Sequence, residues 1–197
     1  PVIVTSEPTQ GPMGLILRLL LSNRLTFTSY TPEMEILSNN SIALLFAADR
    51  LDHLRQTIVP KLEDGVIVIC DRYFASSYAY QMGNDKKSLK WLETINSKCI
   101  IPDLTIFLNT SLTVCEKRRT TNRWYQELYE KPEILKQVSQ NYEYVMEYLD
   151  SKMDIRTIDG TPSEKVVFGE VVSIIKSKFA DEMFPEDLPL FANEEKH

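Results

Sequence analysis

VIVICDRYFASSYAYQ (residues 66–81) joins an apolar, strand-like run to a charged and aromatic segment. Val66 to Cys70 are all apolar, which is typical of a strand covered on both faces of a parallel sheet. Asp71 and Arg72 follow at once. Ligands of open α/β sheets bind beyond the carboxyl ends of the strands. We therefore expect a ligand site here, with the Asp71 carboxylate and the Arg72 guanidinium placed for an anion and its metal.

Strand-like and helix-like segments alternate along the rest of the chain. Short apolar segments predict strands at 2–5, 104–108 and 155–158, and helical patterns occupy 13–21, 41–62, 89–99, 111–119 and 133–151. Thr161, Pro162 and Glu164 have the spacing of a capping box, so we expect a last helix from Thr161 to about Phe179. This alternation predicts an α/β fold with a parallel sheet and helices on both faces.

Composition limits the classes of function. The chain has 197 residues, of which 43% are hydrophobic and 25% charged, so we expect one globular domain with a full-sized core. A net charge of -6 disfavours direct, non-specific binding of nucleic acid. No apolar run approaches the length of a membrane span. Three dispersed cysteines without CxxC spacing indicate reduced thiols and a cytoplasmic location rather than a zinc site.

Several polar residues have both a functional and a structural interpretation. Phe46 and Arg50 are four residues apart and share a helix face, which suits stacking on a base and bonding its carbonyl edge, although a core Phe beside a surface Arg is the commoner case. Arg18 is equally compatible with a ligand and with an ordinary surface position. Residues 118–125 are basic and aromatic, so they form either a solvated turn or a lid over a polyphosphate.

These segments resemble the thymidylate kinase family. The resemblance rests on LLFAADR at 44–50, DRYFASSYAYQ at 71–81, SEPTQGPMG at 6–14, PDLTIFL at 102–108 and IDGTPSE at 158–164, and it covers residues 2 to about 179. It implies a five-stranded parallel sheet of the nucleotide-kinase, P-loop NTPase type. It also implies transfer of the γ-phosphoryl group of ATP to dTMP with Mg²⁺, in dTTP biosynthesis, by a homodimer.

The resemblance assigns a role to each candidate residue. Phe46 would stack on thymine beside Arg50, Arg18 and Arg72 would hold the dTMP phosphate, and Tyr80 would pack by the deoxyribose. The implied substrate-binding residues are Arg18, Phe46, Arg50, Arg72, Ser76, Ser77, Tyr80 and Gln81; the catalytic residues are Arg72 and the lid arginines Arg118, Arg119 and Arg123; Gly160 and Thr161 are near adenine, and Asp71 is at the metal.

The sequence departs from the family in two places. Ser6 occupies the position where the family usually has Arg before Glu-Pro. No G-x-x-x-x-G-K-[ST] loop occurs, although that loop holds the β- and γ-phosphates. We expect that a stretch with the central strand, this loop and a helix precedes Pro1, because outer strands without the middle strand would leave buried backbone groups unpaired. Without that stretch we expect no activity.

Two alternatives to a dTMP kinase stay open. One is a nucleotide-binding relative that has lost phosphoryl transfer, and the other is a deoxynucleoside kinase, against which Arg18 and Arg72 argue because a nucleoside offers no phosphate. Residues 180–197 form an acidic extension to a kinase domain of residues 1–179. Within it, DLPLF at 187–191 either packs on the kinase body or a second subunit, or resembles a peptide that docks on a replication sliding clamp.

Overall fold

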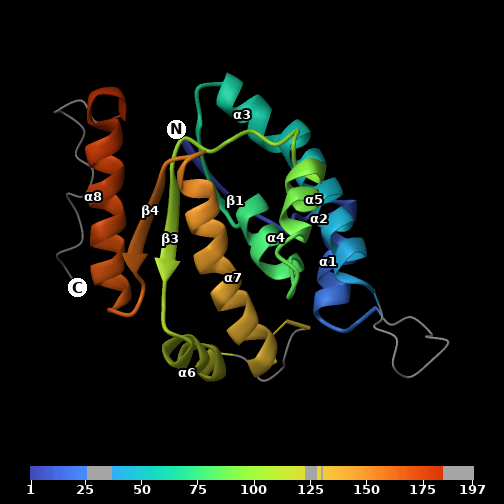
Figure 1. Cartoon of the computed structure of the whole chain (residues 1–197). Coiled ribbons are helices and arrows are strands. Elements are labelled where there is room, and N and C mark those ends of the chain that lie inside the picture. Colours follow the sequence, from blue (N-terminus) through green and yellow to red (C-terminus); the bar gives the residue numbers. More distant parts are fainter. Residues whose placement is uncertain (26–36, 123–127, 130, 184–197) are drawn as a thin grey trace, which may run out of the picture.

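A computed structural model of the chain describes residues 1–25, 37–122, 128–129 and 131–183. The expectations for Arg123 and for the DLPLF segment lie outside these residues. The N-terminal third carries α1 and α2, the middle carries α4 and α5, and the C-terminal part carries α7 and α8 (Figure 1). No helix among the described residues is both long enough and apolar enough to span a bilayer.

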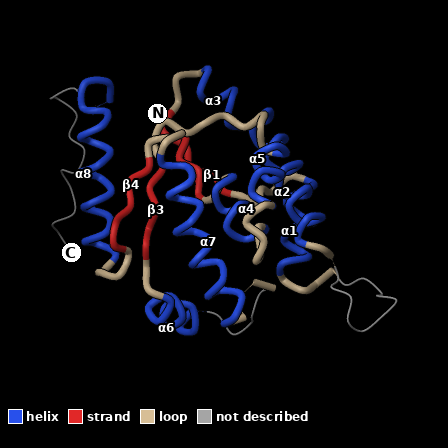
Figure 2. Tube along the Cα trace, in the orientation of Figure 1, coloured by secondary structure: helices blue, strands red, loops and turns tan. Residues whose placement is uncertain are grey.

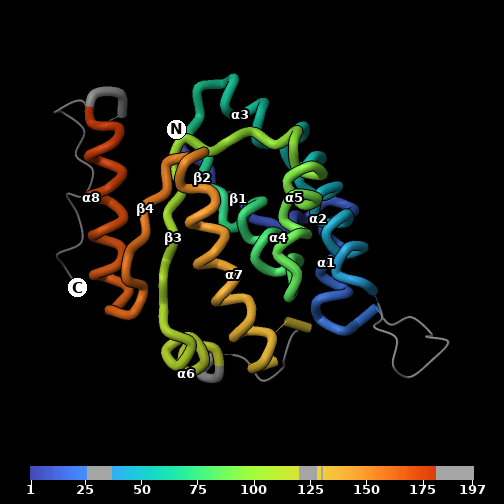
Figure 3. The backbone as a smooth tube through the Cα atoms, in the orientation of Figure 1, coloured from blue at the N-terminus to red at the C-terminus, as the bar shows by residue number. Residues whose placement is uncertain are grey.

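The four described strands form two parallel pairs rather than one five-stranded sheet. β1 (Val2–Ser6) pairs with β2 (Ile67–Asp71), and β3 (Thr105–Asn109) pairs with β4 (Ile155–Asp159), as Figure 2 shows in red and Figure 3 along the chain. The parallel arrangement was predicted correctly, whereas the five-stranded sheet is not confirmed. Among the described residues, each strand has one neighbouring strand, its partner in the pair. Ile69 of β2 and Leu108 of β3 are therefore 47% and 50% exposed, not covered on both faces as expected.

Helices follow the strands with short connections, as βα units require. The sequence sets several of their starts: Pro12 opens the first helix and Pro132 the seventh, while the Ser38 side chain accepts a hydrogen bond from Ser41 N (3.2 Å) at the start of the second. The helices are α1 (Pro12–Leu21), α2 (Asn39–His53), α3 (Val59–Glu63), α4 (Phe74–Gln81), α5 (Ser88–Ile95), α6 (Leu112–Asn122), α7 (Pro132–Asp150) and α8 (Glu164–Met183).

The expected long helix at 41–62 is interrupted. A π-helical turn, Leu54–Ile58, separates α2 from α3. Pro60 follows this turn and has no N–H, and its ring would clash with the carbonyl four residues earlier in a regular α-helix. The wider turn relieves that clash and keeps the chain helical.

The expected capping box at Thr161 is also wrong. α8 begins at Glu164, and Val167 N bonds Ser163 O (3.1 Å), so Ser163 stands at the N-cap position. Thr161 N instead donates to Asp159 Oδ1 (2.8 Å), which holds Thr161 in the turn that follows β4. The helix continues to Met183, past the expected end at Phe179, where the backbone is locally non-helical.

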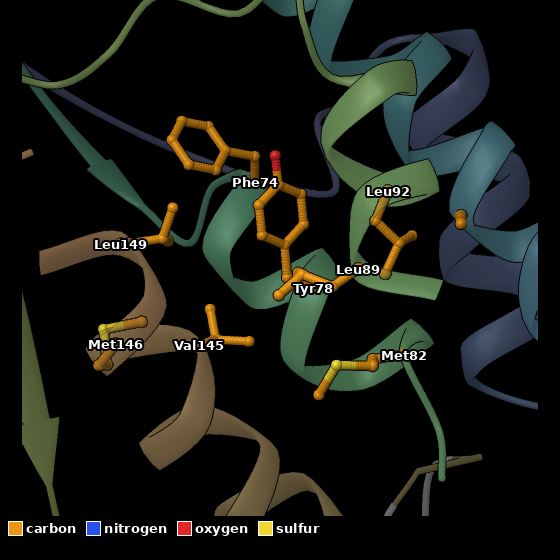
Figure 4. Close-up of a cluster of buried hydrophobic side chains, with 9 residues drawn as sticks. Phe74, Tyr78, Met82, Leu89, Leu92, Val145, Met146 and Leu149 are labelled. Atoms are coloured by element: carbon orange, nitrogen blue, oxygen red, sulfur yellow. The ribbon is translucent and has the colours of Figure 1, made fainter. Parts of the chain in front are cut away.

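The hydrophobic core lies between α4, α5 and α7. Amphipathic spacing on each helix buries one face, and the three faces meet at a cluster that Figure 4 shows in detail. Ala43 of α2 joins this cluster, so α2 is fixed against the same core. Its larger members are Phe74, Tyr78, Met82, Leu89, Leu92, Val145, Met146 and Leu149. The core therefore anchors α2 and α4, the two helices that carry most of the candidate site residues.

Candidate active site

Each strand ends in a polar residue. In the register of the two pairs, Ser6 lies opposite Asp71, and Asn109 lies opposite Asp159. Because strands within a pair are parallel, the loops after them leave the same edge. Glu7 N donates to Asp71 O (3.1 Å), which joins the loops after β1 and β2. The carboxyl ends of the strands in each pair thus bring polar groups together, among them Asp71.

Arg72 stands at the turn between β2 and α4. Its φ of 66° is in the left-handed region, which is uncommon for a residue with a side chain and marks a constrained position. Its guanidinium carbon lies 5.4 Å from the centre of the Tyr80 ring, within cation–π distance. Arg72 is exposed as a residue, but its guanidinium is largely covered and interacts with Tyr80.

Tyr80 belongs to an aromatic group beside Arg72. Its ring makes an edge contact with the Tyr142 ring (centroids 6.0 Å apart), and Tyr142 Oη donates to Ser76 Oγ (2.9 Å). Burial, the largest effect, raises the pKa of Tyr142, and the nearby Arg72 charge opposes that rise. Gln81 Nε2 bonds Tyr129 Oη (3.4 Å). One side of α4 therefore presents hydroxyls and rings next to Arg72.

Arg50 lies in a buried polar network. Its side chain is 1% exposed and forms an ion pair between Nη2 and Glu7 Oε2 (2.7 Å). Nη1 donates to Asn96 Oδ1 (2.5 Å), and Nη2 donates to Ser77 Oγ (3.1 Å). The guanidinium also faces the Tyr73 ring at 5.3 Å. The alternative in which Arg50 lies at the surface beside a core Phe46 is therefore wrong for Arg50, because its side chain is buried.

His53 is buried and extends this network. Its Nδ1 lies 3.2 Å from Glu7 Oε1, and its Nε2 lies 2.7 Å from Thr5 Oγ1. Glu7, His53 and Cys70 place one ligand-type atom each within 4.8 Å of one another. Burial, followed by the Glu7 charge, raises the pKa of the Cys70 thiol to about 12, so it stays protonated. Glu7 is also engaged by Arg50, and the group is best described as an internal network.

Arg18 fastens the loop after β1. Its Nε donates to Thr9 O (3.2 Å), and its Nη2 donates to Pro8 O next to the cis Glu7–Pro8 peptide. Asp49 accepts from Thr9 N (2.8 Å) and Thr9 Oγ1 (2.6 Å) on the other side of the loop. A Cβ at Gly14 would lie 2.1 Å from Thr9 O, so only glycine lets α1 approach this closely. These contacts hold Arg18 on the loop rather than leaving it free in solvent.

Phe46 is half-buried on α2, one turn before Arg50. A polar cavity of about 460 Å³ lies on the Arg18 side of the loop, between β1, α1 and the π-helical turn. Arg18 and His53 line it, whereas Phe46, Arg72 and Tyr80 do not. Of these candidate residues, Arg18 is therefore the one that lines this cavity.

The basic segment begins as a helix. Arg118 and Arg119 belong to α6, as expected for the helix at 111–119, and α6 continues to Asn122. Arg118 Nη1 donates to Gly160 O (2.7 Å), and its Nη2 donates to Thr161 O (2.9 Å) and Pro162 O (2.7 Å). Arg118 therefore ties α6 to the loop after β4. A Cβ at Gly160 would lie 2.0 Å from Thr110 Oγ1, which excludes larger residues there.

The Asp71 carboxylate has the chemistry of a Mg²⁺ ligand. Mg²⁺ is held in nucleotide sites by one or two carboxylates, with phosphate oxygens and waters completing its shell. The Asp71 side chain is exposed at the end of β2, next to Arg72, so its oxygens are open to such an ion. Its backbone O is already bonded by Glu7 N, which fixes the position of the residue.

Sequence reasoning missed Glu7 and Asn96. Glu7 belongs to the SEPTQGPMG segment but was given no role, and Asn96 lies in a stretch read only as helix. Both are at most 5% exposed, and both bond Arg50. A buried arginine needs an acidic partner, so an assignment of Arg50 to the interior would have directed attention to Glu7.

Comparisons with known proteins agree on one family. The family model described as Thymidylate kinase matches residues 1–171. A probable thymidylate kinase of Pyrococcus abyssi is 38% identical over 178 residues, and the match covers 89% of this chain and 81% of the relative. A probable thymidylate kinase of Pyrobaculum aerophilum is 38% identical over 141 residues, and the match covers 72% of this chain and 67% of the relative. A solved structure of thymidylate kinase from Candida albicans matches with a TM-score of 0.71 at 27% identity, covering 90% of this chain and 80% of that one.

Proposed function

The chain belongs to the thymidylate kinase family, whose members phosphorylate dTMP, and we propose that it does so with ATP as donor, using the groups around α4 as its dTMP site. The observation that carries the proposal is the position of the two arginines. Arg50 bonds Ser77 of α4, and Arg72 lies over the ring of Tyr80 on the same helix. α4 therefore contacts both arginines and aligns Arg50, the donor for the base, with Arg72, the donor for the phosphate.

Each end of this arrangement suits a part of dTMP. The Arg72 guanidinium, at a strand end, can grip the phosphate with charge-assisted hydrogen bonds. Phe46 offers a half-buried ring for stacking on thymine. Tyr80, Ser76 and Gln81 line α4 beside Arg72 and suit the deoxyribose. Arg18 acts through the loop that it fastens, and this loop carries Glu7.

Positioning and charge stabilisation are the main sources of catalysis in phosphoryl transfer. Arg72 fixes the acceptor phosphate, so that one of its oxygens can attack the donor in line. Asp71 would hold Mg²⁺, which neutralises charge on the donor phosphates when bound. Arg118, Arg119 and Arg123 are the lid candidates, and Gly160 and Thr161 are the residues we assign to the adenine side. Arg118 supports that grouping because it bonds the carbonyls of Gly160 and Thr161.

We also propose that the protein is a homodimer that works in the cytoplasm. α1 and α2 pack together and expose apolar side chains on their outer faces: Leu15, Ile16, Leu44 and Leu51. An apolar patch of this kind suits a self-complementary interface. The free thiols of Cys70, Cys99 and Cys115 support a reducing compartment.

A coupled ADP-release assay on the full-length protein tests the proposal. We expect turnover with dTMP and ATP, loss of turnover when EDTA removes Mg²⁺, and none with thymidine in place of dTMP. Turnover with thymidine but not with dTMP would show that the acceptor is a nucleoside and would overturn the proposal. Sedimentation of the same sample reports the oligomeric state, with Leu44→Glu expected to yield monomers.

A further inference from the structure

Arg50 is held by segments that are distant in sequence. Glu7 comes from the loop after β1, Ser77 from α4 and Asn96 from the end of α5. Each supplies an oxygen to a guanidinium that is 1% exposed. A side chain fixed on three sides has little rotational freedom left, so its remaining donors point in a fixed direction.

One of the remaining donors, Nε, has no partner among the described residues. A guanidinium carries five N–H groups. Glu7 and Ser77 both engage Nη2, and Asn96 engages Nη1. Nε is buried and has no hydrogen-bond partner within the described part of the chain. An unpaired buried donor is costly, so an acceptor on a ligand would be stabilised at this edge of Arg50.

Asn96 forms hydrogen bonds to Arg50 and to its own helix through different side-chain atoms. Oδ1 accepts from Arg50 Nη1, while Nδ2 donates to Leu92 O (2.8 Å) at the end of α5. Its side chain is buried, so both atoms exchange water for protein partners. The two roles can therefore be separated by substitution, because aspartate keeps the acceptor and loses the donor.

We propose that Asn96 is a positioning residue that sets the choice of pyrimidine. This inference rests on the proposed function, in which Arg50 contacts the base. Asn96 Oδ1 fixes the guanidinium so that its free N–H groups face the 4-position of the ring. Thymine and uracil have a carbonyl there, which accepts from Arg50. Cytosine has an amino group, which donates, and a guanidinium has no acceptor for it. Asn96 thus favours 4-carbonyl pyrimidine nucleotides without touching them.

The test compares dTMP, dUMP and dCMP on the full-length protein by titration calorimetry and by steady-state kinetics. The ratio of dUMP to dCMP affinity isolates the 4-position, because neither base carries the 5-methyl group. We expect Asn96→Ala, and the near-isosteric Asn96→Leu, to weaken dTMP and dUMP binding about tenfold, to leave dCMP binding unchanged and to leave kcat for dTMP within about twofold.

Asn96→Asp and Tyr148→Phe are the matched variants. Asn96→Asp keeps the oxygen for Arg50 and should retain the dUMP-to-dCMP ratio, although it loses the bond to Leu92 O and some thermal stability. Tyr148→Phe removes the bond from Tyr148 Oη to Glu93 Oε2 (2.9 Å), which also fastens α5 but does not touch Arg50. It should lower stability without changing the ratio.

The outcomes separate this inference from the proposed function. A wild-type ratio in Asn96→Ala and Asn96→Leu would overturn the positioning role, as would an equal loss of the ratio in Asn96→Asp. If Asn96→Ala does not fold, the comparison of Asn96→Leu with Asn96→Asp decides. Failure of the wild-type protein to phosphorylate dTMP would refute the proposed function itself, and the inference with it.

Discussion

Arg50 and Arg72 flank the same helix but lie in opposite environments. Arg50 is buried and ion-paired with Glu7, whereas Arg72 is exposed and has an aromatic ring as its described neighbour. Burying a charge is costly unless it is paired and hydrogen-bonded, so Arg50 requires its protein partners. Arg72 has no such requirement and can turn its donors to a phosphate. Arg50 is thus held mainly by the fold, with its Nε left without a protein partner in the described part of the chain, whereas Arg72 stands at a strand end beside an aromatic ring.

The largest effect should come from the buried side. Glu7→Gln leaves the Arg50 charge without a counter-charge in the interior, so we expect the free energy of unfolding to fall by about 3 to 5 kcal/mol, measured by urea denaturation. Glu93→Gln is the control, because the Glu93–Lys152 pair is largely exposed and should contribute less than about 1 kcal/mol. Equal losses in the two variants would remove the contrast between buried and exposed charge.

Arg72→Ala tests the exposed side. We expect turnover of dTMP to fall about a hundredfold or more, because the acceptor phosphate loses a charge-assisted grip, while stability changes little. Arg72→Lys should recover part of the rate, since it restores charge but not the planar fork. Arg156→Ala, which removes an exposed arginine on β4, provides the control in the same assay. A wild-type rate and wild-type dTMP affinity in Arg72→Ala would show that the phosphate site is elsewhere.

Phe46→Ala should have a smaller effect, confined to binding. Loss of one stacking ring weakens base binding by about 1 to 3 kcal/mol, so we expect a rise of about tenfold in the Kd for dTMP and little change in kcat. Calorimetric titration with dTMP measures it. Phe168→Ala, which truncates an exposed phenylalanine on α8, should bind dTMP as the wild type does. A drop in kcat with unchanged Kd would assign Phe46 to another step.

Cys70 should give the smallest effect near neutral pH. Its folded-state pKa of about 12 lies above the ordinary value of 9.0, so the stability that this thiol contributes is complete below about pH 9 and is lost as the pH rises towards 12. At neutral pH the raised pKa should slow alkylation. Mass spectrometry after iodoacetamide treatment of the folded protein should find the exposed Cys115 modified before Cys70. The reverse order would contradict the burial of Cys70.

Local patterns predicted local structure well. The apolar runs ending in Cys70 and Leu108 lie in β2 and β3, each shifted by one residue to end in a polar side chain. Helix boundaries failed where a local signal competed with a neighbouring contact: Thr161 has the composition of a cap, but its N–H bonds Asp159. Pro60 was visible in the sequence, whereas the turn that accommodates it depends on the whole helix.

In the candidate site, too, residues close together in the sequence could be predicted, whereas contacts between distant segments could not. Arg72 and Tyr80 lie within one short segment, so spacing and resemblance could single out both as candidates. Glu7 and Asn96 meet Arg50 only after the chain has folded, and no periodicity links residues that far apart. Arg18 was singled out as a candidate, but its bonds to the carbonyls of Pro8 and Thr9 depend on the loop conformation.

The Arg50 network also bears on how the chain folds. Arg50 is separated by 46 residues from Asn96 and by 27 from Ser77, so its charge can leave water only after distant segments have come together. We expect this step late, after the transition state, with the α4–α5–α7 core already formed. Asn96→Ala should then accelerate unfolding and leave the refolding rate unchanged. The contact that aligns Arg50 for the base would therefore also set how long the folded state lasts.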